Sequence, residues 1–256
     1  MVKQAKKKNQ DYFQIYGING SSKVIQEKKI NIIRIDIMAG GIAEKKSWII
    51  NLARIKSSLV HRMPKVQFLK KYAGKRTQGI VVTFMGKIIK NIPSFEKGSN
   101  NICLIAIDNM EDPQNLGQII RTAECAGIDG ILIPEHGNVK ATSTVLQVSQ
   151  GAFIYLPLYN CGNLHQQLRN LKSQGFWIVG VENSIQSKYW YELDYQCKLV
   201  IVMGSEGKGI RPIIRKTCDD LLTIPMQGTL NSLNVSAAVS AVLFERHRQM
   251  LQACTN

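Results

Sequence analysis

The second part of the chain alternates between short apolar runs and segments with helical spacing. The apolar runs predict buried strands at Ile102–Ile107, Gly130–Ile133, Ala152–Leu156, Phe176–Val181, Leu199–Met203 and Leu221–Ile224. The intervening spacing predicts helices at Leu116–Ala126, Thr144–Ser149, Leu164–Ser173 and Val235–Leu251. This alternation favours an α/β fold with a mostly parallel sheet covered on both faces. Ligands of such sheets bind beyond the carboxyl ends of the strands.

The first part of the chain predicts a small α/β unit. Its apolar pattern indicates strands at Asn31–Met38, Lys65–Phe68 and Gly79–Phe84. Helical spacing over Glu44–Val60 places five apolar side chains on one side: Trp48, Ile49, Leu52, Ile55 and Leu59. Pro, Gly and Asn residues in 87–100 are typical of a linker. The predicted organisation is therefore a tail at 1–12, a small domain at 13–86, a linker at 87–100 and a larger domain at 101–256.

Charge separates the same two parts. The 256 residues carry a net charge of +15. Residues 1–98 hold 21 basic and 5 acidic side chains, whereas residues 99–256 hold 12 and 13. The whole excess belongs to the first part, which favours a module that binds a nucleic acid. An anionic membrane surface is the competing partner, but the pattern predicts no strongly amphipathic basic helix with Trp or Phe to insert.

Cysteine usage and hydropathy point to an intracellular protein. The six cysteines lie tens of residues apart, without a C-x-x-C pair or a nearby His pair, at positions 103, 125, 161, 197, 218 and 254. We therefore expect no metal and free thiols in a reducing cytoplasm. No apolar run approaches the roughly 18–20 residues of a membrane span, and no apolar segment follows the N-terminal lysines as in a secretory signal. A cytoplasmic protein with no membrane partner is expected.

The first candidate motif is Asp108–Arg121, a strand end followed by a turn and a helix. Asn115 is a plausible N-cap, and Gly117 allows close approach of another backbone. Helical geometry places Gly117 and Arg121 opposite the core stripe of Ile119, Ile120, Ala123 and Ala126. Arg121 is either a solvated surface arginine or a group that orients a phosphate or a ribose hydroxyl.

The second candidate motif is the glycine-rich loop Met203–Ile210, which follows a predicted strand. Three glycines in six residues expose backbone N–H groups to a ligand. The loop is not a P-loop, because Gly209 rather than Ser or Thr follows Lys208. A plain tight turn is the alternative interpretation.

The third candidate motif is Ile224–Ala238, a short strand, a loop of small polar residues and a helix. Ser232 and Asn234 stand immediately before that helix, where they are expected as caps whether or not they have a function. Three polar, glycine-bearing loops at strand ends in one domain favour a ligand site. Hydrolytic chemistry is not favoured, because the four His show no triad pattern and no Ser lies in G-x-S-x-G.

Together, NLGQIIRTA (115–123), IVMGSEGKGI (201–210) and IPMQGTLNSLNVSAA (224–238) resemble the three motifs of the SpoU, or TrmH-like, branch of the SPOUT RNA ribose 2′-O-methyltransferases. VSQGA (148–152) also resembles a family element. More loosely, IYGINGSSKVIQ (15–26) and RTQGIVV (76–82) are similar to the ribosomal-protein-like substrate-binding module of the RlmB subgroup.

The resemblance implies a parallel-sheet SPOUT domain with a C-terminal trefoil knot, a homodimer with each active site near the subunit interface, and S-adenosylmethionine bound in the knot. It implies that main-chain groups of Gly204, Ile224 and Leu233 hold the adenosine part of the cofactor. It also implies catalytic residues, with Arg121 activating the ribose hydroxyl and the site completed by Asn115, Glu206, Ser232 and Asn234.

A ribose 2′-hydroxyl as the target atom implies RNA rather than DNA as the partner. The RlmB likeness implies methylation of a guanosine in large-subunit rRNA, either free or in a precursor particle. Two alternatives remain open, a tRNA ribose 2′-O-methyltransferase and a catalytically silent RNA-binding ribosome assembly factor. The basic module of about 100 residues counts against the tRNA enzyme, since that branch commonly binds through short extensions.

Overall fold

The computed structural model describes residues 12–49, 51, 57–95, 101–183, 187–205, 207–230 and 232–253. The chain divides into two compact units, Met1–Lys87 and Ile88–Asn256.

The first unit contains a four-stranded sheet in the order β1-β4-β2-β3. β4 pairs antiparallel with both β1 and β2, whereas β3 is parallel to β2. The strands are β1 (Tyr12–Tyr16), β2 (Asn31–Met38), β3 (Val60–Met63) and β4 (Ile80–Met85). The principal helices are α1 (Ile18–Gln26) and α3 (Lys65–Lys71).

The predicted strands Asn31–Met38 and Gly79–Phe84 are confirmed as β2 and β4, but the predicted strand Lys65–Phe68 is wrong. This segment begins α3, where Phe68 and Tyr72 lie one turn apart and pack on Val81 of the sheet.

The predicted helix Glu44–Val60 is also wrong in extent. The 3₁₀ turns η1 (Ala43–Lys45) and η2 (Ser57–Leu59) lie at its two ends, and Val60 already begins β3. Residues 47–49 and 51 are helical, while 50 and 52–56 lie outside the described residues.

A buried carboxylate joins β2 to α3 in this unit. The Asp36 side chain is 2% exposed and accepts hydrogen bonds from Arg34 Nε at 2.7 Å, from Lys71 Nζ at 2.8 Å and from the Tyr72 hydroxyl. Burial alone would raise the pKa of Asp36, but the bonds from Lys71, Tyr72 and Arg34 outweigh it and lower that pKa below its ordinary value. The carboxylate is therefore ionised and fully partnered.

The second unit contains an eight-stranded sheet in the order β10-β12-β9-β11-β6-β7-β8-β5, and every pairing in it is parallel. The strands are β5 (Ile89–Asn91), β6 (Cys103–Ile107), β7 (Gly130–Ile133), β8 (Leu158–Asn160), β9 (Trp177–Val181), β10 (Lys188–Tyr189), β11 (Leu199–Met203) and β12 (Asp220–Thr223). The central strands β6 and β11 are buried at every position, as expected for a sheet covered on both faces.

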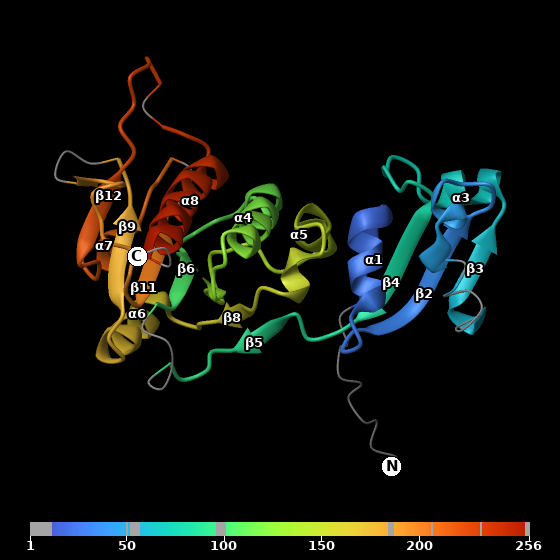
Figure 1. The fold of residues 1–256 in the computed structure, drawn as a ribbon, viewed down its shortest axis with the longest axis horizontal. Helices are drawn as coiled ribbons and strands as arrows, with labels where there is room; N and C mark the ends of the chain where they lie inside the picture. Colours follow the sequence, from blue (N-terminus) through green and yellow to red (C-terminus); the bar gives the residue numbers. More distant parts are fainter. Residues whose placement is uncertain are drawn as a thin grey trace, which may run out of the picture. The chain divides into compact units, whose positions relative to one another are not determined.

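Helices cover both faces of this sheet. They are α4 (Pro113–Cys125), α5 (Ser143–Val148), α6 (Leu164–Ser173), α7 (Pro212–Arg215) and α8 (Val235–Ala253). Leu168 of α6 and Ile214 of α7 belong to one apolar cluster with Val200 of β11. Helix α4 contacts both α5 and α8, so the three helices lie side by side (Figure 1). No helix in the described ranges is long and apolar enough to cross a membrane.

All four predicted helices and five of the six predicted strands of this unit are confirmed, with small shifts at their ends. The predicted strand Ala152–Leu156 is wrong, because Ala152–Ile154 forms a 3₁₀ turn after Gly151, whose φ is +87°. Phe153 and Leu156 are buried all the same, so a turn can bury the side chains of a short apolar run as well as a strand does. The segment 87–100, which its composition indicates as a linker, contains β5, and β5 pairs with β8.

We expect Asp36→Asn to destabilise the first unit. Losing one member of a buried ion pair costs about 3–5 kcal/mol, and we expect a smaller loss of about 2 kcal/mol because Arg34 and Lys71 are partly exposed. Amide hydrogen exchange in peptides from β2 and β4 measures this loss as a lower free energy of opening.

The same substitution has a predicted pH dependence. Since the folded-state pKa of Asp36 is lowered, its stabilisation is complete above the unfolded-state pKa and disappears as pH falls through the folded-state pKa. The difference in opening free energy between the native chain and Asp36→Asn should therefore shrink below about pH 4. A difference that grows on acidification would contradict this account.

Candidate functional site

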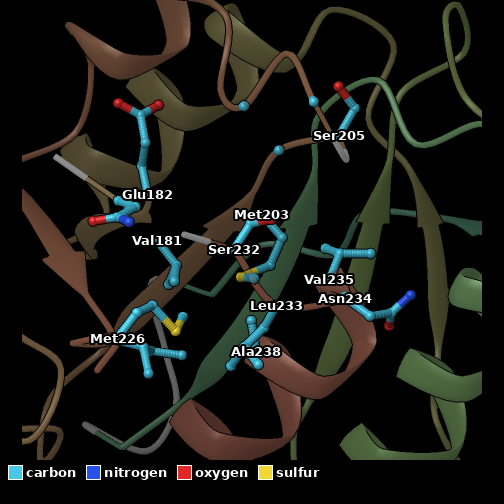
Figure 2. Close-up of a pocket in the computed structure, with 15 residues that line it drawn as sticks. Val181, Glu182, Met203, Ser205, Met226, Ser232, Leu233, Asn234, Val235 and Ala238 are labelled. Atoms are coloured by element: carbon cyan, nitrogen blue, oxygen red, sulfur yellow. The ribbon is translucent and has the colours of Figure 1, made fainter. Parts of the chain in front are cut away.

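A cavity of about 650 Å³ opens at the carboxyl edge of the second sheet. Its walls come from the ends of β9 and β11, from the segment after β12 and from the first turns of α8 (Figure 2). The lining residues are Val181–Asn183, Met203–Ser205, Gly207, Gly209, Ile224, Met226, Ser232–Val235 and Ala238. This is the edge at which the three sequence motifs were expected to meet.

The glycine-rich loop forms one wall and is folded back on itself. Backbone hydrogen bonds run in both directions between Ser205 and Gly209, at 3.2 and 3.1 Å. A Cβ placed on Gly204 would lie 2.2 Å from the Gly209 carbonyl carbon and 2.5 Å from Ile210 N. Since both neighbours are backbone atoms, Gly204 allows a close approach that no other residue permits.

The segment before α8 supplies a second wall. Asn234 caps the helix, because its Oδ1 accepts from Ser236 N at 2.9 Å. Leu233 is 44% exposed and lines the cavity together with Ile224 and Ser232. The predicted capping role is thus confirmed for Asn234.

Asn115 joins this wall from α4. The predicted N-cap role of Asn115 is wrong, since Asp112 caps α4 by accepting from Gln114 N, and Pro113 takes the first helical position. Asn115 lies inside the helix, 5% exposed, and its Oδ1 accepts from Asn234 Nδ2 at 3.0 Å. A second link joins Gln118 of the same helix to Ser236 Oγ at 2.7 Å.

Gly117 and Arg121 have different surroundings, although both were expected opposite the core stripe. A Cβ on Gly117 would lie 2.5 Å from the Val148 Cβ, so the expected close approach is made by α5. Arg121 is exposed, does not line the cavity, and has no hydrogen-bond or ion-pair partner among the described residues. The structure therefore brings Gly204, Ile224, Ser232, Leu233 and Asn234 to the cavity, attaches Asn115 through Asn234, and leaves Arg121 apart. Glu206 lies outside the described residues.

Two carboxylates beside the cavity were not among the sequence candidates. Glu182 follows β9 and is the one acidic side chain among the described lining residues. Asp108 follows β6, is fully buried and pairs with Arg211. An acidic residue directly after a buried strand is the signal that could have found them, but it is weak, since solvated strand ends look the same.

Comparison with known proteins places this architecture in a family. The SpoU rRNA Methylase family model matches residues 103–244. A 23S rRNA (guanosine-2'-O-)-methyltransferase RlmB from Shewanella oneidensis is 33% identical over 238 residues, which are 92% of this chain and 96% of that protein.

Two solved structures show the same fold. The SpoU methyltransferase AviRb from Streptomyces viridochromogenes, in complex with AdoMet, matches with a TM-score of 0.76 at 19% identity, covering 94% of this chain and 91% of that one. The TrmH/SpoU tRNA modifying enzyme of A. aeolicus matches with a TM-score of 0.56 at 29% identity, covering 62% of this chain and 80% of its own. With a family model over more than half its length and a relative that it matches almost end to end, the chain belongs to the SpoU rRNA methylase family.

Proposed function

We propose that this protein transfers a methyl group from S-adenosylmethionine to a ribose 2′-hydroxyl, that of a guanosine in large-subunit rRNA. The observation that carries the proposal is the cavity at the carboxyl edge of the second sheet, where five candidate residues of two motifs line one space. The family membership of the chain and the name of its Shewanella relative support the same chemistry.

The cavity fits the proposed cofactor in size and character. Its volume of about 650 Å³ lies within the range of small-molecule sites. Apolar side chains of Val181, Met203 and Met226 suit a flat adenine ring, while the Gly204 loop allows a ligand to contact backbone groups. S-adenosylmethionine supplies an electrophilic methyl group when it is bound.

The residues of the chain then align a ribose hydroxyl and stabilise its developing charge. A ribose hydroxyl does not ionise by itself at neutral pH, and a guanidinium offers hydrogen-bond donors but no acceptor, so we assign Arg121 to electrostatic stabilisation of the alkoxide rather than to proton removal. Ser232 lines the cavity and is proposed to contact the same hydroxyl and to pass its proton to an RNA phosphate or to water, while S-adenosylhomocysteine leaves as the product. The bond between Asn234 and Asn115 holds this wall against α4. Glu206 completes the proposed catalytic set.

The first unit is proposed to bind the RNA. From Lys45 to Phe95 the chain has no acidic residue, and α3 with the turn after it carries Lys65, Lys70 and Arg76 on its exposed surface. The near full-length match to an RlmB protein includes this basic part and favours rRNA over tRNA as the substrate.

Further proposals concern assembly and compartment. We propose a homodimer with each site near the subunit interface, which agrees with an Arg121 that does not line the cavity of its own chain. We also propose the C-terminal trefoil knot that the sequence resemblance implies. The five described cysteines are free, in keeping with a reducing cytoplasm.

The proposed function is tested by transfer of labelled methyl from S-adenosylmethionine to large-subunit rRNA that lacks its own modifications, with tRNA alongside. We expect label in rRNA at a position where alkaline cleavage is blocked.

Arg121→Ala should abolish transfer, a loss of roughly 100-fold or more, with cofactor affinity nearly unchanged. Arg169→Ala, which removes an exposed arginine of α6, is the control. Label in tRNA alone would overturn the substrate, and equal losses of transfer and affinity would make Arg121 a binding residue.

Gly204→Ala should sharply weaken cofactor binding, because its methyl group would overlap the Gly209 and Ile210 backbone and displace the loop. Gly228→Ala is the matched control, since a Cβ at Gly228 meets nothing within 4 Å. Calorimetric titration with S-adenosylmethionine distinguishes the two variants. Equal affinities would show that the loop does not shape the cofactor site.

Removing charge from α3 should weaken RNA binding and its salt dependence. For Lys65→Gln combined with Lys70→Gln, we expect the slope of log affinity against log salt to fall by about 1 to 2, as two phosphate contacts predict. Arg169→Gln combined with Lys216→Gln removes the same charge from the second unit and should change the slope little. If both double variants lower the RNA affinity and the salt slope by the same amount, the overall charge of the chain, rather than the charge of the first unit, governs affinity.

A further inference from the structure

Two carboxylates stand level with the start of the glycine-rich loop, one on each side. β11 lies between β6 and β9, and its last residue, Met203, is in register with Ile107 and Val181. The next residues along the three strands are therefore Gly204, Asp108 and Glu182. Both carboxylates reach the segment in which the loop returns and enters α7.

Asp108 holds this segment from the β6 side. Its Oδ2 accepts from the backbone N–H of Arg211 at 2.8 Å, and its Oδ1 accepts from Nε of the same residue at 2.7 Å and forms an ion pair with Nη2 at 2.7 Å. Asp108 has no exposed surface, and its own N–H donates to Met203 O at 2.8 Å. One buried side chain thus binds both the backbone and the guanidinium of Arg211.

Glu182 holds the preceding residue from the β9 side. Its Oε2 accepts from Ile210 N at 3.3 Å, and its Oε1 pairs with Arg215 Nη1 of α7 at 3.2 Å. Its backbone N–H donates to Leu222 O of β12 at 2.9 Å. The carboxylate is therefore anchored to the sheet, with 17% of its side chain exposed at the cavity wall.

The two carboxylates together determine where the loop lies. Consecutive N–H groups, those of Ile210 and Arg211, point to opposite sides and each meets a charged acceptor, which makes the bonds stronger than neutral ones. Ile210 N is also one of the atoms that a Cβ on Gly204 would overlap. Holding Ile210 thus holds the two ends of the loop together.

We propose that Asp108 and Glu182 form a carboxylate clamp, positioning residues that keep the Gly204–Gly209 loop in the shape that binds the cofactor. The inference rests on the proposed function for the identity of that ligand. Neither residue is assigned a chemical step. Direct contact between Glu182 and the positive charge of the cofactor is the competing role, because Glu182 also lines the cavity.

The test compares Asp108→Asn and Glu182→Gln with a control carboxylate at the opposite edge of the sheet. Asp219 precedes β12, accepts from Ile178 N at 2.9 Å and pairs with Lys172 at 2.7 Å, so it matches Glu182 in chemistry but lies at the amino edge of the sheet. Asp219→Asn should leave ligand binding unchanged.

The first readout is affinity for S-adenosylmethionine, which is cationic at sulfur, and for S-adenosylhomocysteine, which is neutral there. A clamp that acts through loop shape should lower both affinities equally, by roughly tenfold for each variant. Loss confined to S-adenosylmethionine in Glu182→Gln would overturn the clamp in favour of direct charge recognition. Unchanged affinity for both ligands in both variants would also overturn it.

The second readout is hydrogen exchange of the ligand-free full chain in a peptide covering the loop. Both clamp variants should speed exchange at the Ile210 and Arg211 amides and leave peptides from β6 and β9 protected, which separates a local effect from misfolding. Faster exchange across the whole sheet, or none in the loop, would contradict the proposal. If the native chain binds neither ligand, the proposed function fails, while this readout still tests the clamp.

Discussion

The level carboxyl edge of three parallel strands is the constraint on which the candidate site depends. Because β6, β11 and β9 pair without a shift in register, they end side by side. The residues that follow must turn away within one crowded layer, and the cavity occupies the space that these turns enclose. Segments that lie far apart in the sequence, such as those after β9, β11 and β12, therefore need no long reach to share a ligand site.

Crowding at this edge explains why small and polar residues gather there. Gly204 is required by the backbone that passes beside it, and Gly117 by the contact between α4 and α5. Asn234 satisfies an N–H group at the start of α8 and also binds Asn115 on α4. The same residues thus cap helix ends, hold the helices together and shape the cavity. The position of a residue at this edge therefore does not reveal whether replacing it would affect ligand binding or packing.

Apolar runs predicted most of the second unit because a doubly covered parallel sheet needs uninterrupted burial, as β6 and β11 show. The same rule failed at Ala152–Leu156, because a turn buries Phe153 and Leu156 without a strand, and at Lys65–Phe68, because Phe68 is buried on a helix while Val66 is exposed.

At the site, the strand-end motifs predicted where Gly204, Ser232 and Leu233 gather. They could not predict that Asn115 bonds Asn234, nor that Arg121 lies away from the cavity, because both depend on how α4 packs against α8. The sequence did not predict a role for Glu182, because a single carboxylate after an apolar run does not reveal whether its partner is water or a backbone N–H.

Charge adds a further demand on the same edge. A site that methylates RNA must hold its cofactor loop firmly and still accept a polyanion, yet the strongest acceptors for backbone N–H groups are carboxylates, which repel phosphate. Asp108 pairs with Arg211 and Glu182 pairs with Arg215, both in the segment that follows the loop, so a positive charge lies next to each carboxylate and offsets its negative charge. The nearly neutral second unit then needs no positive surface of its own to overcome repulsion, and the excess charge is concentrated in residues 1–98. Under the proposed function, loop rigidity depends on Asp108 and Glu182 and RNA attraction depends on residues 1–98, so each could change without loss of the other.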